Sequence, residues 1–152
     1  MSMEPQLKPT TATARMSVPA SPIWFSGVRN LLIMYCRNSG ITDRSAGSMA
    51  VALDEAMSNI YRHGYHGSCD EMIDIEIKTE QATETKPWKI KICIEDRATQ
   101  IALDKIQSRD LEDVRPGGLG VYLMKRIMDS VDWSYREGGG MRLVMEKHGV
   151  IK

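Results

Sequence analysis

The sequence predicts an α+β fold, a two-layer α/β sandwich in which helices cover one face of a mostly antiparallel, mixed sheet. Its expected elements run helix, helix, strand, strand, loop, helix, strand, strand, a grouping typical of α+β domains. The strands also form pairs joined by polar or glycine-rich turns, as in antiparallel hairpins. The chain has 152 residues, so we expect one domain over 13–152 after a flexible polar tail at 1–12.

The first elements are a strand and a helix. MSVPA (16–20) is expected to be a short edge strand. The following helix is marked by Ser21 as its cap, Pro22 at its first position and Gly40 beyond its end. Its expected buried stripe consists of Ile23, Val28, Leu31, Leu32 and Tyr35.

A second helix is expected to begin after Thr42 or Asp43 and to run to about His63, with Gly64 at its exit. Apolar residues recur with helical spacing along it, which predicts one buried face. That face consists of Met49, Ala52, Leu53, Ala56, Met57 and Ile60.

Two hairpins supply the other strands. MIDIEIK (72–78) and WKIKICIED (88–96) alternate isoleucine with polar residues, so they predict two paired strands with one buried face. VDWSYR (131–136) and MRLVMEK (141–147) are expected to pair around the Gly138–Gly140 turn.

The segment between the hairpins is the least regular. Charged and small polar residues dominate 96–117, and a loop of this length inside a compact domain often serves as a lid or binding loop. A short helical turn is expected within it. LGVYLMKRIMDS (119–130) then predicts a third helix.

Composition narrows the classes of function. Twenty basic residues balance twenty acidic ones, so no overall field favours nucleic acid or an anionic membrane as a direct partner. The cysteines, Cys36, Cys69 and Cys93, form no CxxC pair, and we expect reduced thiols in or near the core. The N-terminus has no apolar signal-peptide run, and we expect a cytoplasmic protein.

Glu55 and Asn59 are the first candidate site residues. They lie four residues apart on the predicted second helix and therefore share a face. An ionised glutamate is a possible base, and an asparagine oxygen suits Mg²⁺. The alternative is a solvated face with local hydrogen bonds. His63 and His66 form an HxxH pattern without an evident third metal ligand.

Two further candidates lie later in the chain. Asp96 ends an apolar strand, where it either faces a ligand or simply terminates the strand. PGGLG (116–120) precedes the third helix, whose free N–H groups suit phosphate, although many such glycine clusters are only turns. The segment is not a Walker loop, because the GK[ST] ending is absent.

Taken in order, EAMSN with RHGY, then IEDRA, then RPGGLGVYLMKRIMD resemble the ATP-binding fold shared by gyrase, the heat-shock chaperone ATPases and histidine kinases. HGY and the helix ending in MD resemble its small branch of bacterial anti-sigma factor serine-protein kinases. The resemblance covers about residues 15–148 and implies a histidine kinase-like ATPase fold.

The resemblance also implies roles for individual residues. Glu55 matches the general base, Asn59 the Mg²⁺ ligand, and Asp96 the carboxylate that accepts a hydrogen bond from the adenine amino group. The family usually carries glycine two residues after that aspartate, where this chain has Ala98. Gly118 and Gly120 match the glycines that line the phosphates, and a mobile lid is implied at about 104–115. Ala98, Gly117 and Leu119 are also expected to contact the nucleotide.

These roles imply a serine/threonine-protein kinase that binds ATP and Mg²⁺ and acts as a partner-switching regulator. Its expected substrate is an anti-anti-sigma (STAS-domain) protein, it would alternately sequester a sigma factor or another target, and the family suggests a homodimer. Because of Ala98, a non-catalytic switch, either nucleotide-dependent or nucleotide-free, remains an alternative. The ATPase piece of a larger sensor kinase is less favoured, because no histidine-bearing dimerisation helices are recognisable.

Overall fold

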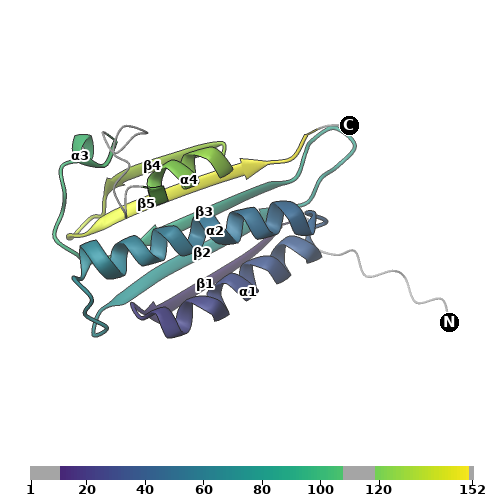
Figure 1. The fold of residues 1–152 in the computed structure, drawn as a ribbon. Helices are drawn as coiled ribbons and strands as arrows, with labels where there is room; N and C mark the ends of the chain where they lie inside the picture. The colour runs from purple at the N-terminus through teal and green to yellow at the C-terminus, as the bar shows by residue number, and fades with distance from the viewer. Residues whose placement is uncertain (1–10, 108–118, 151–152) are drawn as a thin grey trace.

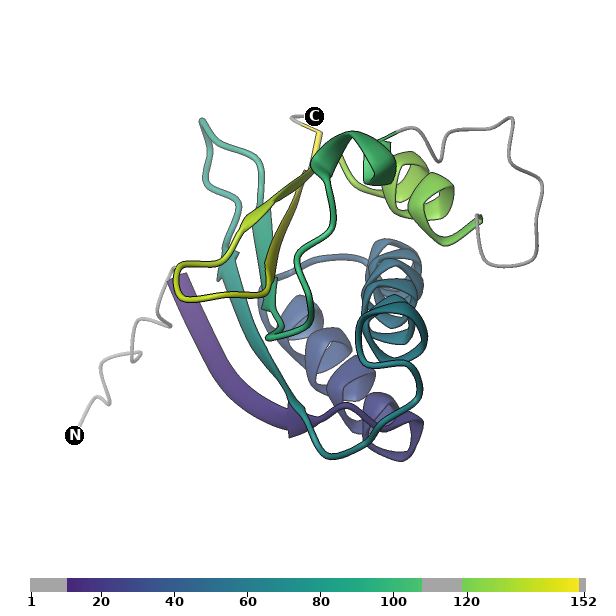
Figure 2. The ribbon, with the colours of Figure 1, turned by 90° about the vertical axis from the view of Figure 1, so that its left-hand side faces the viewer.

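The computed structural model describes residues 11–107 and 119–150, and these form the predicted two-layer α+β sandwich. Helices α1, α2 and α4 lie on the same side of a five-stranded sheet of order β1-β2-β3-β5-β4 (Figures 1 and 2). All four strand pairings are antiparallel, so the described strands include none of the parallel pairs that a mixed sheet would contain. The elements are β1 (Thr11–Pro19), α1 (Pro22–Asn38), α2 (Asp43–Asn59), a π-helical turn η1 (Ile60–Gly64), β2 (Met72–Glu80), β3 (Lys89–Glu95), α3 (Leu103–Gln107), α4 (Leu119–Ile127), β4 (Ser130–Tyr135) and β5 (Met141–His148).

Strand β1 is longer than predicted. It begins at Thr11 rather than at Met16, and Thr11 and Ala12, which the sequence assigned to the tail, pair with β2. The stretch from 11 to 18 alternates more polar and less polar residues, but its inward residues are small or only moderately apolar. Its strand pattern is therefore weak, and pairing with β2 decides its conformation.

The buried stripe of α1 differs from the predicted one. Phe25, Val28, Leu32 and Cys36 are buried, whereas Ile23 is 73% exposed. Leu31 and Tyr35 are only partly buried. The stripe follows the regular spacing of three or four residues from Phe25, and this spacing leaves Ile23 on the outer side.

Helix α2 is a central element of the helical layer and packs against both α1 and α4. The Thr42 hydroxyl caps it by accepting a hydrogen bond from the backbone N–H of Ser45 at 3.3 Å. The predicted face is buried, except that Ile60 is only partly covered. The α-helix ends at Asn59, and the chain continues through η1, where Tyr65 N–H donates to the Ile60 carbonyl. A π-turn of this kind often marks a functional position in a helix.

The core lies between the sheet and the helices. Isoleucines of β2 and β3, together with Met141, Leu143 and Met145 of β5, face the helices and are buried, as the alternation predicts. The opposite sheet face carries mainly polar and charged side chains. Among the described residues, no helix combines the length and apolar character that crossing a bilayer requires.

Candidate functional site

The end of α2 and the start of α4 bring three predicted site residues together. Gly120 is buried at the first turn of α4. A Cβ atom added to it would lie 2.7 Å from Glu55 Oε2 and 3.4 Å from Asn59 Nδ2. Only glycine allows this approach without displacing the glutamate. The structure therefore places the carboxylate, the carboxamide and the glycine in one cluster. Helical spacing predicted only that Glu55 and Asn59 lie on the same face.

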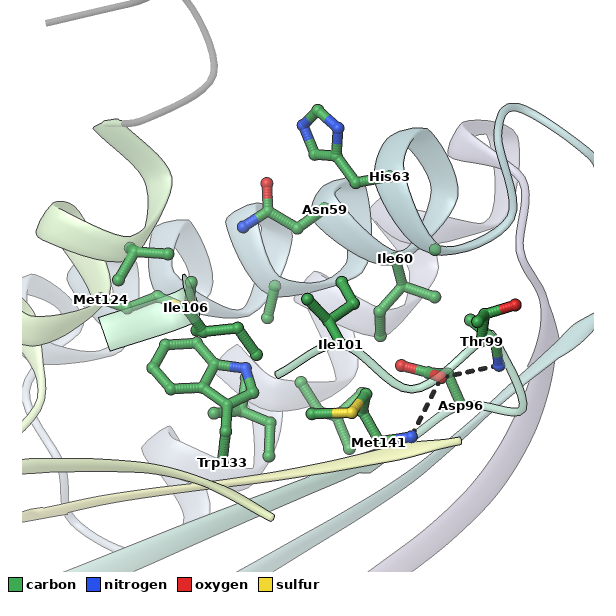
Figure 3. A pocket seen from close by; sticks show the side chains of 16 residues that line it. Asn59, Ile60, His63, Asp96, Thr99, Ile101, Ile106, Met124, Trp133 and Met141 are labelled. Atoms are coloured by element: carbon green, nitrogen blue, oxygen red, sulfur yellow. Dashed lines mark hydrogen bonds between the residues drawn. The ribbon is translucent and has the colours of Figure 1, made fainter. Parts of the chain in front are cut away.

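Asp96 is held at the end of β3 by its own carboxylate. Its Oδ1 accepts hydrogen bonds from the backbone N–H of Ala98 at 2.9 Å and of Met141 at 3.2 Å. The other oxygen, Oδ2, makes no hydrogen bond within the described part of the chain and points into the pocket (Figure 3). Asp96 thus presents one fixed acceptor to a ligand.

The environment of Asp96 raises the pKa of its carboxyl group above the usual value. Burial is the main cause, because desolvation disfavours the charged form. The two backbone N–H groups and the charge of Arg136 act in the opposite direction. A perturbed carboxyl group in a concave site is typical of functional positions.

Gly140 fixes the relation between the last hairpin and Asp96. Its φ of +93° favours glycine, and an added Cβ would overlap the backbone carbonyl of Asp96. The hairpin can therefore approach closely enough for Met141 to exchange hydrogen bonds with Asp96. The sequence identified Gly138–Gly140 only as a turn. Its role beside Asp96 depends on a contact across 44 residues of chain, which no local pattern encodes.

Tyr65 is another residue whose role the sequence did not assign. Its hydroxyl donates to the Met72 carbonyl at 2.9 Å and accepts from the Arg97 backbone N–H at 2.8 Å. Burial raises the pKa of this phenol, so it stays protonated and able to donate. Tyr65 therefore ties the exit of α2 to the segment that follows Asp96.

Ala98 occupies the position where the family usually has glycine. Its methyl group faces Gly64, because a Cβ added to Gly64 would lie 3.1 Å from Ala98 Cβ. The missing side chain at Gly64 therefore leaves the room that the Ala98 methyl group needs.

The pocket itself lies between α2, the segment after β3, α4 and the sheet (Figure 3). Asn59, His63, Asp96 and Thr99 supply its polar groups. Its walls are otherwise apolar, and the sequence did not single these positions out, because they come from several distant elements. They include Ile60, Ile94, Ile101, Ile106, Met124, Trp133, Met141 and Leu143.

Other predicted site residues either are exposed or lie outside the described part of the chain. Leu119 begins α4 and is 54% exposed. Gly117, Gly118 and most of the predicted lid lie outside the described residues. The expected helical turn between the two hairpins is α3, within the described part. Within the described part, no three histidine, cysteine or acidic side chains gather as a metal site, and His63 instead lines the pocket.

Comparison with known proteins identifies the class. A family model described as a histidine kinase-like ATPase domain matches residues 18–147. Among solved structures, the SiaB–SiaC complex from Pseudomonas aeruginosa contains a chain of similar fold, with a TM-score of 0.53 and 13% sequence identity. The match covers 90% of this chain and 89% of that one.

Curated relatives narrow the class further. The chain is 30% identical over 132 residues to the serine-protein kinase RsbW of Staphylococcus aureus (strain JH9), covering 82% of this chain and 79% of the relative. It is 26% identical over 141 residues to RsbW of Listeria monocytogenes serotype 4a (strain HCC23), covering 88% and 85%. The chain therefore belongs to the histidine kinase-like ATPase family, in its branch of anti-sigma factor serine-protein kinases.

Proposed function

We propose that this protein is a serine/threonine-protein kinase that binds ATP with Mg²⁺ and phosphorylates an anti-anti-sigma (STAS-domain) protein. The observation that carries the proposal is that Asn59 belongs to two groups of residues. It lines the pocket that also contains the Asp96 carboxylate, and it lies beside Glu55 and Gly120 where α2 meets α4.

The residues present fit an adenine nucleotide. Asp96 Oδ2 is an available acceptor for the adenine amino group, and the apolar walls suit a base. Asn59 carries the carboxamide oxygen that a hard cation such as Mg²⁺ prefers. Gly120 has no side chain, so the backbone at the start of α4 can lie close to Glu55 and Asn59. The free N–H groups at a helix start suit a phosphate.

Glu55 is proposed as the general base. A carboxylate beside the phosphate end accepts the proton of an incoming serine or threonine hydroxyl as that oxygen attacks. Bound Mg-ATP would supply the phosphoryl group and the charge neutralisation that its transfer requires. The contribution of the protein is positional, because one helical turn holds both Glu55 and Asn59.

The names of the curated relatives support the kinase part of the proposal. They are serine-protein kinases, and we propose that this chain likewise alternates between its phosphorylation substrate and a sequestered sigma factor or other target. We further propose that it acts in the cytoplasm and as a homodimer.

A non-catalytic binding switch is the second candidate, and the size of the cavity favours it. The cavity measures about 90 Å³. Small-molecule sites are usually roughly 300–1,000 Å³. The side chains that line this cavity include Ile101, Ile106 and Trp133. These side chains must therefore move before a nucleotide can enter the cavity. If they do not move, the protein would act without ATP.

Replacement of Glu55 tests the kinase proposal. We expect Glu55→Gln to lower phosphotransfer from labelled ATP to the cognate STAS-domain protein by roughly 10²- to 10⁴-fold, because the base is lost. Binding of Mg-ATP, measured by calorimetry, should change little. Asp54→Asn is the matched control, because this neighbouring carboxylate pairs with Arg29 of α1.

The outcomes separate the two candidates. Normal transfer by Glu55→Gln contradicts the assignment of Glu55 as the base. Binding of Mg-ATP by the unaltered protein, without transfer to any STAS-domain protein of its source organism, favours the non-catalytic switch.

A further inference from the structure

Trp133 belongs to the pocket through its place in the sheet. On β4 it pairs with Leu143 of β5, which in turn pairs with Ile94 of β3. These three side chains form a row across the helix-facing side of the sheet, and all three line the pocket. Asp96 and Met141 lie one two-residue step from that row (Figure 3).

The indole ring forms one wall of the pocket rather than part of the sealed core. Trp133 is only partly buried, and β4 is an edge strand. In Figure 3 its ring lies at the opposite end of the pocket from Asp96, with Ile106 and Met124 close to it. The ring therefore offers an aromatic surface to whatever occupies the pocket.

The indole N–H has no hydrogen-bond partner among the described residues, and it is not sealed away from solvent. A buried tryptophan N–H usually has a hydrogen-bond partner, whereas one that reaches solvent can donate to water or to an acceptor on a ligand. The nearby walls of this pocket, such as Ile101, Ile106 and Leu143, are apolar. A ligand that combines a flat apolar surface with an acceptor oxygen would therefore match both the indole ring and its N–H.

We propose that Trp133 contacts the purine and ribose of a bound adenine nucleotide, with its ring against the nucleoside and its N–H available to a ribose oxygen. This inference rests on the proposed function and deepens it. Asp96 and Trp133 are separated by two strand spacings across the sheet (~10 Å) and by one two-residue step along the strand (~7 Å). A nucleoside whose amino group meets Asp96 and whose long axis follows the sheet would therefore reach the indole.

Tryptophan fluorescence tests the contact without relying on catalysis. In the double variant W24F/W88F, Trp133 is the remaining tryptophan, and we expect its emission to change when adenosine or Mg-ADP saturates the site. In W24F/W133F, the remaining tryptophan is Trp88, which immediately precedes β3 and is outside the pocket lining, and its emission should be unaffected. Calorimetry on the same samples establishes that the nucleotide is bound.

Affinity provides the second measurement. Base–aromatic contacts are substantial, so W133A should bind adenosine and ADP about 5- to 100-fold more weakly, by the same factor for both ligands. W133F, which keeps a ring, should lose less. Tyr135→Ala is the matched control, because Tyr135 lies on the same strand but is 48% exposed and outside the pocket lining.

Three results would overturn the inference. The first is unchanged Trp133 emission at calorimetric saturation, and the second is unaltered affinity in a W133A protein that folds normally by circular dichroism. The third is the absence of binding of either ATP or ADP to the unaltered protein, which would overturn the proposed function as well. The first two results leave the proposed function intact.

Discussion

At the scale of single residues, Ala98 packs against Gly64. Ala98 lies two residues after Asp96, at the position where the family usually has glycine. A methyl group at position 98 is accommodated because position 64 has none. The backbone N–H of Ala98 still donates to Asp96 Oδ1, so the substitution does not disturb the hydrogen bond that holds the carboxylate. The two positions form one packing unit and should be coupled energetically.

This coupling predicts a change of sign. Gly64→Ala alone should destabilise the protein by about 1–3 kcal/mol, because the new Cβ crowds Ala98. In an Ala98→Gly background the same substitution should be neutral or stabilising by up to about 1 kcal/mol, because alanine restricts the unfolded chain. Urea unfolding of the two single variants and the double variant measures the coupling. Equal effects of Gly64→Ala in both backgrounds would contradict it.

At the scale of elements, the packing of α4 on α2 assembles the cluster of Glu55, Asn59 and Gly120. Glu55 and Asn59 belong to α2, and only the approach of Gly120 places the start of α4 beside them. The atom closest to a Cβ added at Gly120 is the end of the flexible Glu55 side chain. A methyl group at position 120 should therefore move the Glu55 carboxylate without much loss of folding stability.

Gly120→Ala should thus separate activity from stability. We expect at least about a tenfold loss of phosphotransfer, since displacing a positioned catalytic group can cost this much or more. Its thermal midpoint should stay close to that of the unaltered protein. Gly47→Ala on the outer face of α2 is the control, where an added Cβ meets nothing within 4 Å. It should raise stability by up to about 1 kcal/mol and leave transfer unchanged. Unimpaired transfer by Gly120→Ala would argue against close packing at this point.

At the scale of the whole molecule, the sheet has one buried face and one charged face. On the charged face, Asp74 lies opposite Glu95 and Lys78 opposite Lys91, which are like-charge pairs. Ion pairs such as Arg97 with Asp74 at 3.4 Å join parts of this surface. Exposed pairs of this kind contribute little to stability, so the helix-facing core must provide most of it.

Adjacent residues of β3 test this asymmetry. Ile92→Ala should cost about 2–5 kcal/mol of unfolding free energy, because Ile92 is fully buried beneath the helices. Lys91→Ala, one residue earlier and on the opposite face, should change it by less than about 0.5 kcal/mol. Guanidinium unfolding gives both values. Similar costs at the two positions would mean that the charged face is also covered, as it would be in a tight assembly.

The sequence correctly predicted those elements whose own residues carry a strong pattern. The alternating isoleucines identify β2 and β3, and the spacing of Met49, Leu53 and Met57 identifies α2. Strand β1 was predicted too short because its inward residues are small and its pairing partner lies some 60 residues away. Ile23 was assigned to the wrong side of α1, because the helical repeat alone does not say which part of an apolar segment meets the sheet.

For the site, the sequence by itself determined the residue types and their local spacing: Glu55 with Asn59, Asp96 at a strand end, and glycines before α4. Such features are written within a few residues of chain. Only the tertiary structure decided that Gly120 lies against Glu55, that Gly140 and Met141 hold Asp96, and that Trp133 forms a wall of the same pocket. These are contacts between elements distant in the chain, and the packing of helices on the sheet selects them, because side-chain periodicity fixes a face but not the neighbour that it meets.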